Sequence, residues 1–96
     1  MDVPGTEPER SVFGISVAAE LVGMGVQNLR LYERRGLLEP DRTEGGTRRY
    51  SADDLARLRR IGELLEGGLN LAGIAIVLGL EADNAQLRSE LDDQPP

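Results

Sequence analysis

The 96-residue chain contains no cysteine and no histidine. It therefore cannot form a disulfide bond, a thiolate or imidazole metal site, or a nucleophile paired with a histidine base. Its carboxylates have no visible partner for acid–base chemistry, and its glycine pairs do not follow a phosphate-loop pattern. We expect a protein that is not an enzyme and has no catalytic residue, no metal ion and no cofactor.

Aromatic residues are scarce, since Phe13, Tyr32 and Tyr50 are the only three. A stacking platform for single-stranded nucleic acid is therefore not expected. No apolar stretch is long enough to span a membrane, and none follows a basic signal-peptide region. We expect a soluble cytoplasmic protein without a membrane partner.

Lysine is absent too, so arginine supplies every basic side chain of a chain whose net charge is −6. The charges are segregated: residues 30–60 hold nine arginines and six acids, a balance of +3, whereas the remainder holds two arginines and eleven acids, or −9. Arginine suits bidentate contacts to phosphate or guanine, but a GC-rich genome produces the same bias and is the simpler explanation. The middle of the chain is the candidate nucleic-acid-binding part.

The first half of the chain contains a helix-turn-helix pattern. Ser16 is a candidate cap for a helix that begins at Val17 and ends at the glycines around Met24. A second helix is predicted from about Val26 to Arg35, with Gly36 as its stop. Two short helices joined by a glycine-containing turn are typical of this motif.

A turn-rich segment, residues 40–49, follows the second helix. Gly45 and Gly46 tolerate positive φ, so residues 43–47 are predicted to form the tip of a β-hairpin, or wing. Ser51 and Asp54 then resemble a capping box at the start of a helix with Leu55, Leu58, Ile61 and Leu65 on one face. Gly67-Gly68 ends that helix.

Asn70 is a candidate cap for a further short helix with apolar Leu71, Ile74, Val77 and Leu78. The tail beyond it continues the spacing of a coiled-coil seam, with an asparagine at one position that favours a dimer in fixed register. The predicted dimerisation residues are Val77, Leu80, Asn84, Leu87 and Leu91. The alternative is that the leucines pack on their own domain, because two heptads are marginal alone.

Two segments carry a resemblance to a known family. The sequences NLRLYERRGLL (28–38) and RTEGGTRRYS (42–51) resemble the signature of the MerR transcription regulators. In that family a recognition helix with an arginine, an aromatic and an acid precedes a Gly-Leu stop, a wing with arginines and an Arg-Tyr-Ser start of the next helix. The resemblance extends from about residue 15 to 80, and ISVAAEL (15–21) and NLAGI (70–74) look most like the heat-shock repressor branch.

The resemblance implies a mainly α, winged helix-turn-helix fold with a short β-hairpin wing and a short C-terminal helix. The expected organisation is a disordered tail (1–10), a DNA-binding domain (11–79), a dimerisation helix (80–91) and a second disordered tail (92–96). Larger relatives continue into a long dimer helix and an effector domain. This chain is too short to hold such an effector domain, so we expect no small-molecule ligand.

A helix of this type lies in the major groove of double-stranded DNA, and the wing arginines approach a phosphate or the minor groove. The predicted DNA-binding residues are Gln27, Asn28, Arg30, Leu31, Tyr32, Arg34, Arg35, Arg42, Arg48 and Arg49. Glu33 would be repelled by phosphate, so we expect it to have a structural role and to pair with a nearby arginine such as Arg30 or Arg49. Tyr50 is expected to anchor the wing in the core. For Arg57, Arg59 and Arg60, a solvated face with ion pairs and a DNA backbone contact are equally supported.

The function predicted is that of a homodimeric transcription regulator, a repressor that reads an inverted repeat at the nucleoid. The family resemblance adds regulation of heat-shock or chaperone genes in the stress response, with an Hsp70-type chaperone as co-repressor. One alternative is an architectural protein of the recombination directionality factor type, which binds DNA as a monomer. Another is a chaperone-binding module that keeps the fold without DNA binding.

Overall fold

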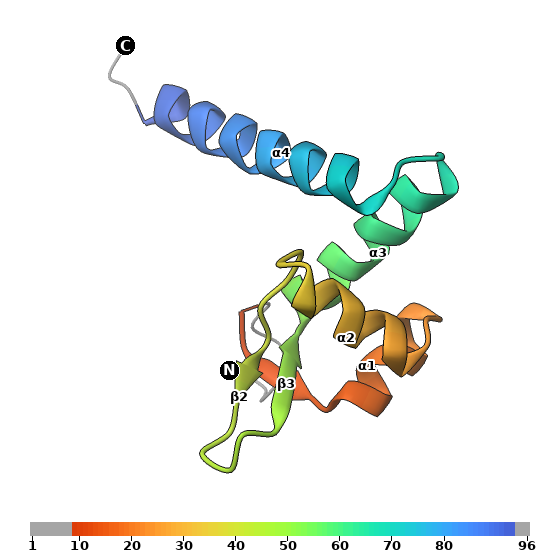
Figure 1. Cartoon of the computed structure of the whole chain (residues 1–96). Coiled ribbons are helices and arrows are strands. Elements are labelled where there is room, and N and C mark those ends of the chain that lie inside the picture. Colours follow the sequence, from red (N-terminus) through yellow and green to blue (C-terminus); the bar gives the residue numbers. More distant parts are fainter. Residues whose placement is uncertain (1–8, 94–96) are drawn as a thin grey trace. The chain divides into compact units, whose positions relative to one another are not determined.

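The computed structural model describes residues 9–93 and has the expected winged helix-turn-helix architecture (Figure 1). In chain order the elements are β1 (Ser11–Phe13), α1 (Ile15–Val22), α2 (Val26–Arg34), β2 (Asp41–Arg42), β3 (Arg48–Ser51), α3 (Ala52–Glu66) and α4 (Leu71–Asp92). The contacts divide the chain into two compact units with the boundary between Glu63 and Leu64. Most of the two predicted disordered tails lies outside the described residues.

Helix α1 begins at Ile15, two residues before the predicted start, and Ser16 is not its cap. The N-cap is Gly14, whose carbonyl accepts a hydrogen bond from the Ala18 N–H at 2.9 Å. The prediction was wrong because strand β1 extends the chain to Phe13, so the turn into the helix comes directly afterwards. The helix ends as predicted, at Gly23, which has a φ of 69°.

The sheet has three antiparallel strands in the order β1-β3-β2. Strands β2 and β3 form the predicted wing, with Arg42 opposite Arg48 and Gly46 in the turn at a φ of 85°. Strand β1 is an addition to the prediction, and its Ser11 donates a hydrogen bond to the Asp41 carboxylate at 2.7 Å. The returning strand of the wing is thus held along both edges.

Helix α3 has the predicted start. The Ser51 N–H donates to the Asp54 carboxylate at 2.8 Å, and the Asp54 N–H donates to the Ser51 hydroxyl at 3.0 Å. This reciprocal pair is a capping box. Its predicted stripe is buried at Leu55, Leu58 and Ile61 but partly exposed at Leu65. Together with buried residues of α1, α2 and β3, these side chains form the core of the first unit.

Helix α4 is one continuous helix of 22 residues, in place of a short helix followed by a separate tail. Its cap is the predicted one, since the Asn70 side chain accepts a hydrogen bond from the Gly73 N–H at 2.8 Å. Gly79 lies inside the helix; glycine lowers helix stability by about 1 kcal/mol relative to alanine but keeps its backbone N–H donor. Across residues 9–93 no helix is both long and apolar enough to cross a membrane.

Candidate nucleic-acid interface

Helix α2 has one buried face and one exposed polar face. Leu29 and Tyr32 lie in the core, at 0% and 5% exposure. The exposed positions are those predicted to contact DNA: Gln27, Asn28, Arg30 and Arg34, with Arg35 at the C-cap. The spacing of three and four residues puts these side chains on one side of the helix. The face is therefore polar, carries three arginines and is accessible.

Two predicted contact residues of α2 lie deeper. Leu31 is half-buried, and Tyr32 is almost entirely buried. Burial raises the pKa of the Tyr32 hydroxyl above its ordinary value, so the group is neutral at pH 7. The ring of Tyr32 packs in the domain, and its hydroxyl is the only part that can form a hydrogen bond to a phosphate.

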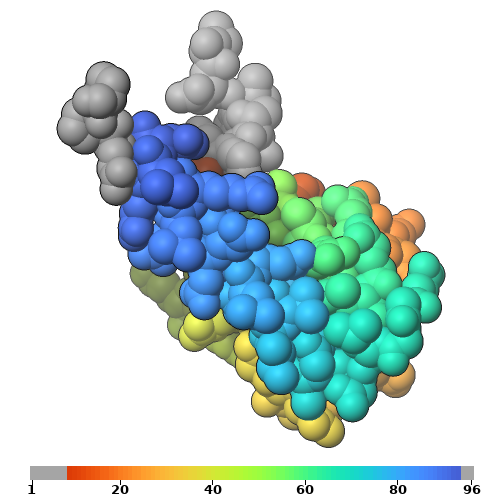
Figure 2. Space-filling model, turned by 90° about the horizontal axis from the view of Figure 1, so that it is seen from above, coloured from red at the N-terminus to blue at the C-terminus, as the bar shows by residue number. Residues whose placement is uncertain are grey.

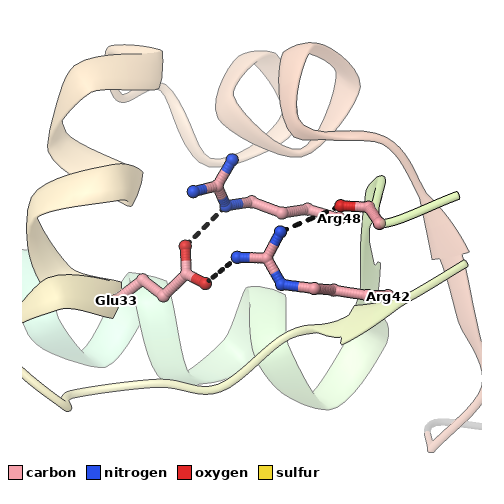
Figure 3. A network of polar contacts seen from close by, with 4 residues as sticks. Glu33, Arg42 and Arg48 are labelled. Carbon is pink, nitrogen blue, oxygen red and sulfur yellow. Dashed lines mark hydrogen bonds and ion pairs between the residues drawn. The ribbon is translucent and has the colours of Figure 1, made fainter.

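Glu33 is the centre of a polar network that joins α2 to both strands of the wing (Figure 3). Its carboxylate accepts hydrogen bonds from Arg42 Nη2 at 2.7 Å and from Arg48 Nε at 2.5 Å. Arg42 Nη1 also donates to the Gly46 carbonyl at 2.9 Å, at the wing tip. Glu33 pairs with arginine, as predicted, but its partners are Arg42 and Arg48 and not the suggested Arg30 or Arg49. The hairpin register puts Arg42 and Arg48 opposite each other, beside the helix.

Burial alone would raise the pKa of Glu33, but the hydrogen bonds and charges of Arg48 and Arg42 lower it below its ordinary value. The glutamate is therefore ionised at neutral pH. Its side chain is 19% exposed, against 27% for Arg48 and 46% for Arg42. One carboxylate between two guanidinium groups leaves a net charge of +1 on this cluster, so the acid does not make the wing repellent to phosphate.

Arg49 and Tyr50 follow Arg48 on strand β3. Arg49 is half-buried, and its Nη1 lies 3.2 Å from the position that a Cβ on Gly14 would occupy, so its guanidinium rests at the start of α1. Tyr50 is 0% exposed, which agrees with its predicted role as the anchor of the wing. Within residues 9–93 its hydroxyl has no hydrogen-bond partner.

The three arginines of α3 serve the fold in different ways. Arg57 Nε donates to the backbone carbonyl of Leu37, and Arg59 Nη2 lies 3.5 Å from the carbonyl of Leu21. Arg60 pairs with Glu63 at 2.9 Å, one of the ion pairs expected on this helix. Arg57 thus holds the segment that follows α2, and Arg59 lies against the end of α1.

The second unit carries the predicted dimerisation residues on the exposed surface of α4, which is blue in Figure 2. Leu80, Leu87 and Leu91 are 62%, 59% and 65% exposed, Asn84 is exposed, and Val77 is half-buried. Ile76, which is 65% exposed, was not among the predicted dimerisation residues. Its spacing of four residues from Leu80 is the signal that was available.

The part of the chain that the structure describes contains no group of three or more acidic, histidine or cysteine side chains that could hold a metal ion. The polar and charged groups of the first unit thus offer hydrogen-bond donors, chiefly guanidinium groups, on an exposed helix and a hairpin. This chemistry suits the recognition of an anionic partner.

Residues 13–80 match the family described as MerR HTH family regulatory protein. HspR of Streptomyces coelicolor, named as a heat shock protein, is 49% identical over 79 residues, which are 81% of this chain and 52% of that protein. The transcriptional regulator GlnR of Bacillus anthracis is 35% identical over 75 residues, 78% of this chain and 58% of that protein. The chain thus spans little more than half the length of these relatives.

Two solved structures resemble this chain in fold. The crystal structure of HiNmlR, a MerR family regulator lacking the sensor domain and bound to promoter DNA, aligns with a TM-score of 0.65 and 30% identity over 84% of this chain and 64% of that one. MtaN, the N-terminal part of a Bacillus subtilis multidrug transporter activator, aligns with a TM-score of 0.65 and 28% identity over 83% and 85%. The family match, the sequence relatives and the fold agree, and the chain belongs to the MerR family of regulatory proteins.

Proposed function

We propose that this protein is a sequence-specific regulator that binds double-stranded DNA through its first unit and represses transcription. The observation that carries the proposal is the exposed polar face of α2, with Arg30, Arg34 and Arg35, beside a wing that carries three more arginines. A helix of this kind reads base edges in the major groove, while guanidinium groups contact phosphates. HiNmlR, which has the same fold, is bound to promoter DNA.

The DNA-contacting residues in this proposal are Gln27, Asn28, Arg30, Leu31, Tyr32, Arg34, Arg35, Arg42, Arg48 and Arg49. The amides near the start of α2 suit adenine edges, and the arginines suit guanine or phosphate. The identity of 49% with HspR supports the regulation of heat-shock or chaperone genes. A cytoplasmic location at the nucleoid and an Hsp70-type co-repressor belong to the same proposal.

Selection from a library of random double-stranded DNA tests the specificity directly. A dimer that reads two half-sites enriches an inverted repeat, whereas an architectural protein enriches little beyond base composition. The affinity for the enriched duplex is then measured across a salt series. In a plot of the logarithm of affinity against the logarithm of salt concentration, each phosphate contact contributes about −0.9 to the slope. Several contacts therefore make the affinity fall steeply as salt is added. A flat response, or no binding, would contradict DNA recognition and favour a protein-binding module.

We further propose that α4 joins two copies of the chain. Ile76, Leu80, Leu87 and Leu91 expose large aliphatic side chains along one helix face, and burying each is worth roughly 1 to 2 kcal/mol. The exposed Asn84 lies along the same face and would fix the register. This stripe is the observation that favours a dimer over a monomer.

Leu87→Asp tests the dimer, and Ala85→Asp is its matched control. Both put a carboxylate on an exposed position of α4, but residues two apart do not share a helix face. Analytical ultracentrifugation should show a monomer for Leu87→Asp and a dimer for Ala85→Asp. If Leu87→Asp is monomeric but binds the enriched duplex as tightly as the unchanged protein, the architectural alternative is favoured.

A further inference from the structure

Arg42 and Arg48 are both held by Glu33, but the carboxylate leaves different parts of the two guanidinium groups available. Arg42 uses both terminal nitrogens inside the wing, Nη2 on Glu33 and Nη1 on the Gly46 carbonyl. Arg48 uses only Nε, and Figure 3 draws no contact from either of its terminal nitrogens. Within residues 9–93, no protein group accepts a hydrogen bond from these two nitrogens.

The two terminal nitrogens of an arginine form a planar fork that matches two oxygens of a phosphate or the O6 and N7 atoms of guanine. A flexible arginine must lose rotamer freedom to make such a contact. In Arg48 the bond from Nε to Glu33 already fixes the plane of the group. The fork is therefore oriented before any partner arrives.

We propose that Glu33 is a positioning residue that orients the outer edge of Arg48 toward the DNA, and that Arg42 braces the wing tip without contacting DNA. The inference rests on the proposed DNA-binding function and revises it in one respect: Arg42 leaves the proposed set of DNA-contacting residues, whereas Arg48 stays in it. Glu33 touches no DNA itself and acts through Arg48.

The charge of Glu33 makes the inference testable, because electrostatics and positioning predict opposite results. Glu33→Gln raises the net charge by one, so a purely electrostatic role predicts tighter binding to every duplex. Positioning predicts weaker binding to the enriched duplex together with equal or tighter binding to a shuffled duplex of the same length and composition. The measured quantity is the ratio of the two affinities, which should fall about tenfold.

Glu44→Gln is the matched control. Glu44 lies on the exposed wing tip, and within residues 9–93 no hydrogen bond or ion pair engages its carboxylate. Its replacement changes the net charge by the same amount. Glu44→Gln should leave the ratio unchanged. If Glu33→Gln and Glu44→Gln change the ratio equally, the positioning role is overturned.

Two further variants separate Arg48 from Arg42 and keep the test valid if Glu33→Gln fails to fold. Arg48→Lys keeps the charge but has no fork, and should lose about tenfold in affinity for the enriched duplex with little loss for the shuffled one. Arg42→Lys should bind the enriched duplex with the unchanged salt slope. If Arg48→Lys bound the enriched duplex as tightly as the unchanged protein does, the inference would be overturned.

Double-mutant measurements then locate the effect. If Glu33 acts through Arg48, Glu33→Gln should have no further effect on the affinity ratio of Arg48→Ala. If Glu33→Gln lowered the affinity ratio of Arg48→Ala as much as it lowers that of the unchanged protein, the inference would be overturned. These outcomes are distinct from a failure of the proposed function, in which the unchanged protein enriches no sequence and binds neither duplex.

Discussion

The hydroxyl of Tyr50 is enclosed in the core, and within residues 9–93 it has no hydrogen-bond partner. Burial, followed by the negative charge of Glu33, raises its pKa, so the group is neutral at all ordinary pH values. A buried hydroxyl without a partner costs about 1 to 3 kcal/mol of stability. Tyr50→Phe removes that cost and keeps the ring that anchors the wing.

We expect Tyr50→Phe to raise the free energy of unfolding by about 1 kcal/mol, since the small void left by the oxygen offsets part of the gain. For a domain of this size, that corresponds to an increase of about 4 to 8 °C in Tm. Urea unfolding followed by circular dichroism measures it, and an unchanged m-value shows that the unfolding reaction is the same. All samples need one protein concentration, because dimerisation would itself shift Tm.

Tyr32→Phe is the control, because the Tyr32 hydroxyl is not an unpartnered buried atom and its removal should give a smaller gain. The reasoning would be refuted if Tyr50→Phe lost about 1 kcal/mol or more. Such a loss would mean that the Tyr50 hydroxyl is hydrogen-bonded in the native protein.

Three further predictions concern single side chains. The pKa of Glu33 lies below its ordinary value of 4.5 in the folded protein, so its stabilising effect is full above that value and is lost as the pH falls through the lower folded pKa. The stability difference between the unchanged protein and Glu33→Gln should therefore be constant near pH 7 and shrink as the pH falls below 4.5 in urea titrations; a difference that grows in acid would contradict the network. Asn70→Ala removes the cap of α4 and should cost about 1 kcal/mol, visible as lost helicity on heating, whereas Asn70→Ser should restore most of it. Gly36→Ala should lower the free energy of unfolding by about 1 to 2 kcal/mol, because the φ of Gly36 is 73°. Gly79→Ala inside α4 should raise it by about 1 kcal/mol. If both substitutions changed stability in the same direction, the backbone conformation assigned to one of the two glycines would be wrong.

Local chemistry in the sequence predicted several features correctly. Ser51 and Asp54 sit three residues apart, and Asn70 precedes an apolar run, so both helix starts depend only on neighbours in the chain. The stop at Gly23 and the turn at Gly46 follow from the ease with which glycine adopts positive φ. These features need no knowledge of distant residues.

Long-range pairing accounts for most of what the sequence did not show. Strand β1 has three residues and no periodicity, and it exists because it pairs with β3 about 40 residues later, which also explains the wrong cap at Ser16. The partners of Glu33 lie 9 and 15 residues away. Here a signal was present: a hairpin with its tip at residues 43–47 puts Arg42 opposite Arg48, so the two share a face of the wing.

The support of the wing by β1 has a practical consequence for cutting and fusing this chain. The segment that matches the family begins at Phe13, the last residue of β1, whereas the pairing of Ser11 with Ser51 and its hydrogen bond to Asp41 lie upstream. A fragment trimmed to the family boundaries would keep both helices of the helix-turn-helix but would leave one edge of β3 without its neighbour. Expression fragments and affinity tags should therefore preserve residues 11–13, or the hairpin will be loosened by the design of the fragment itself.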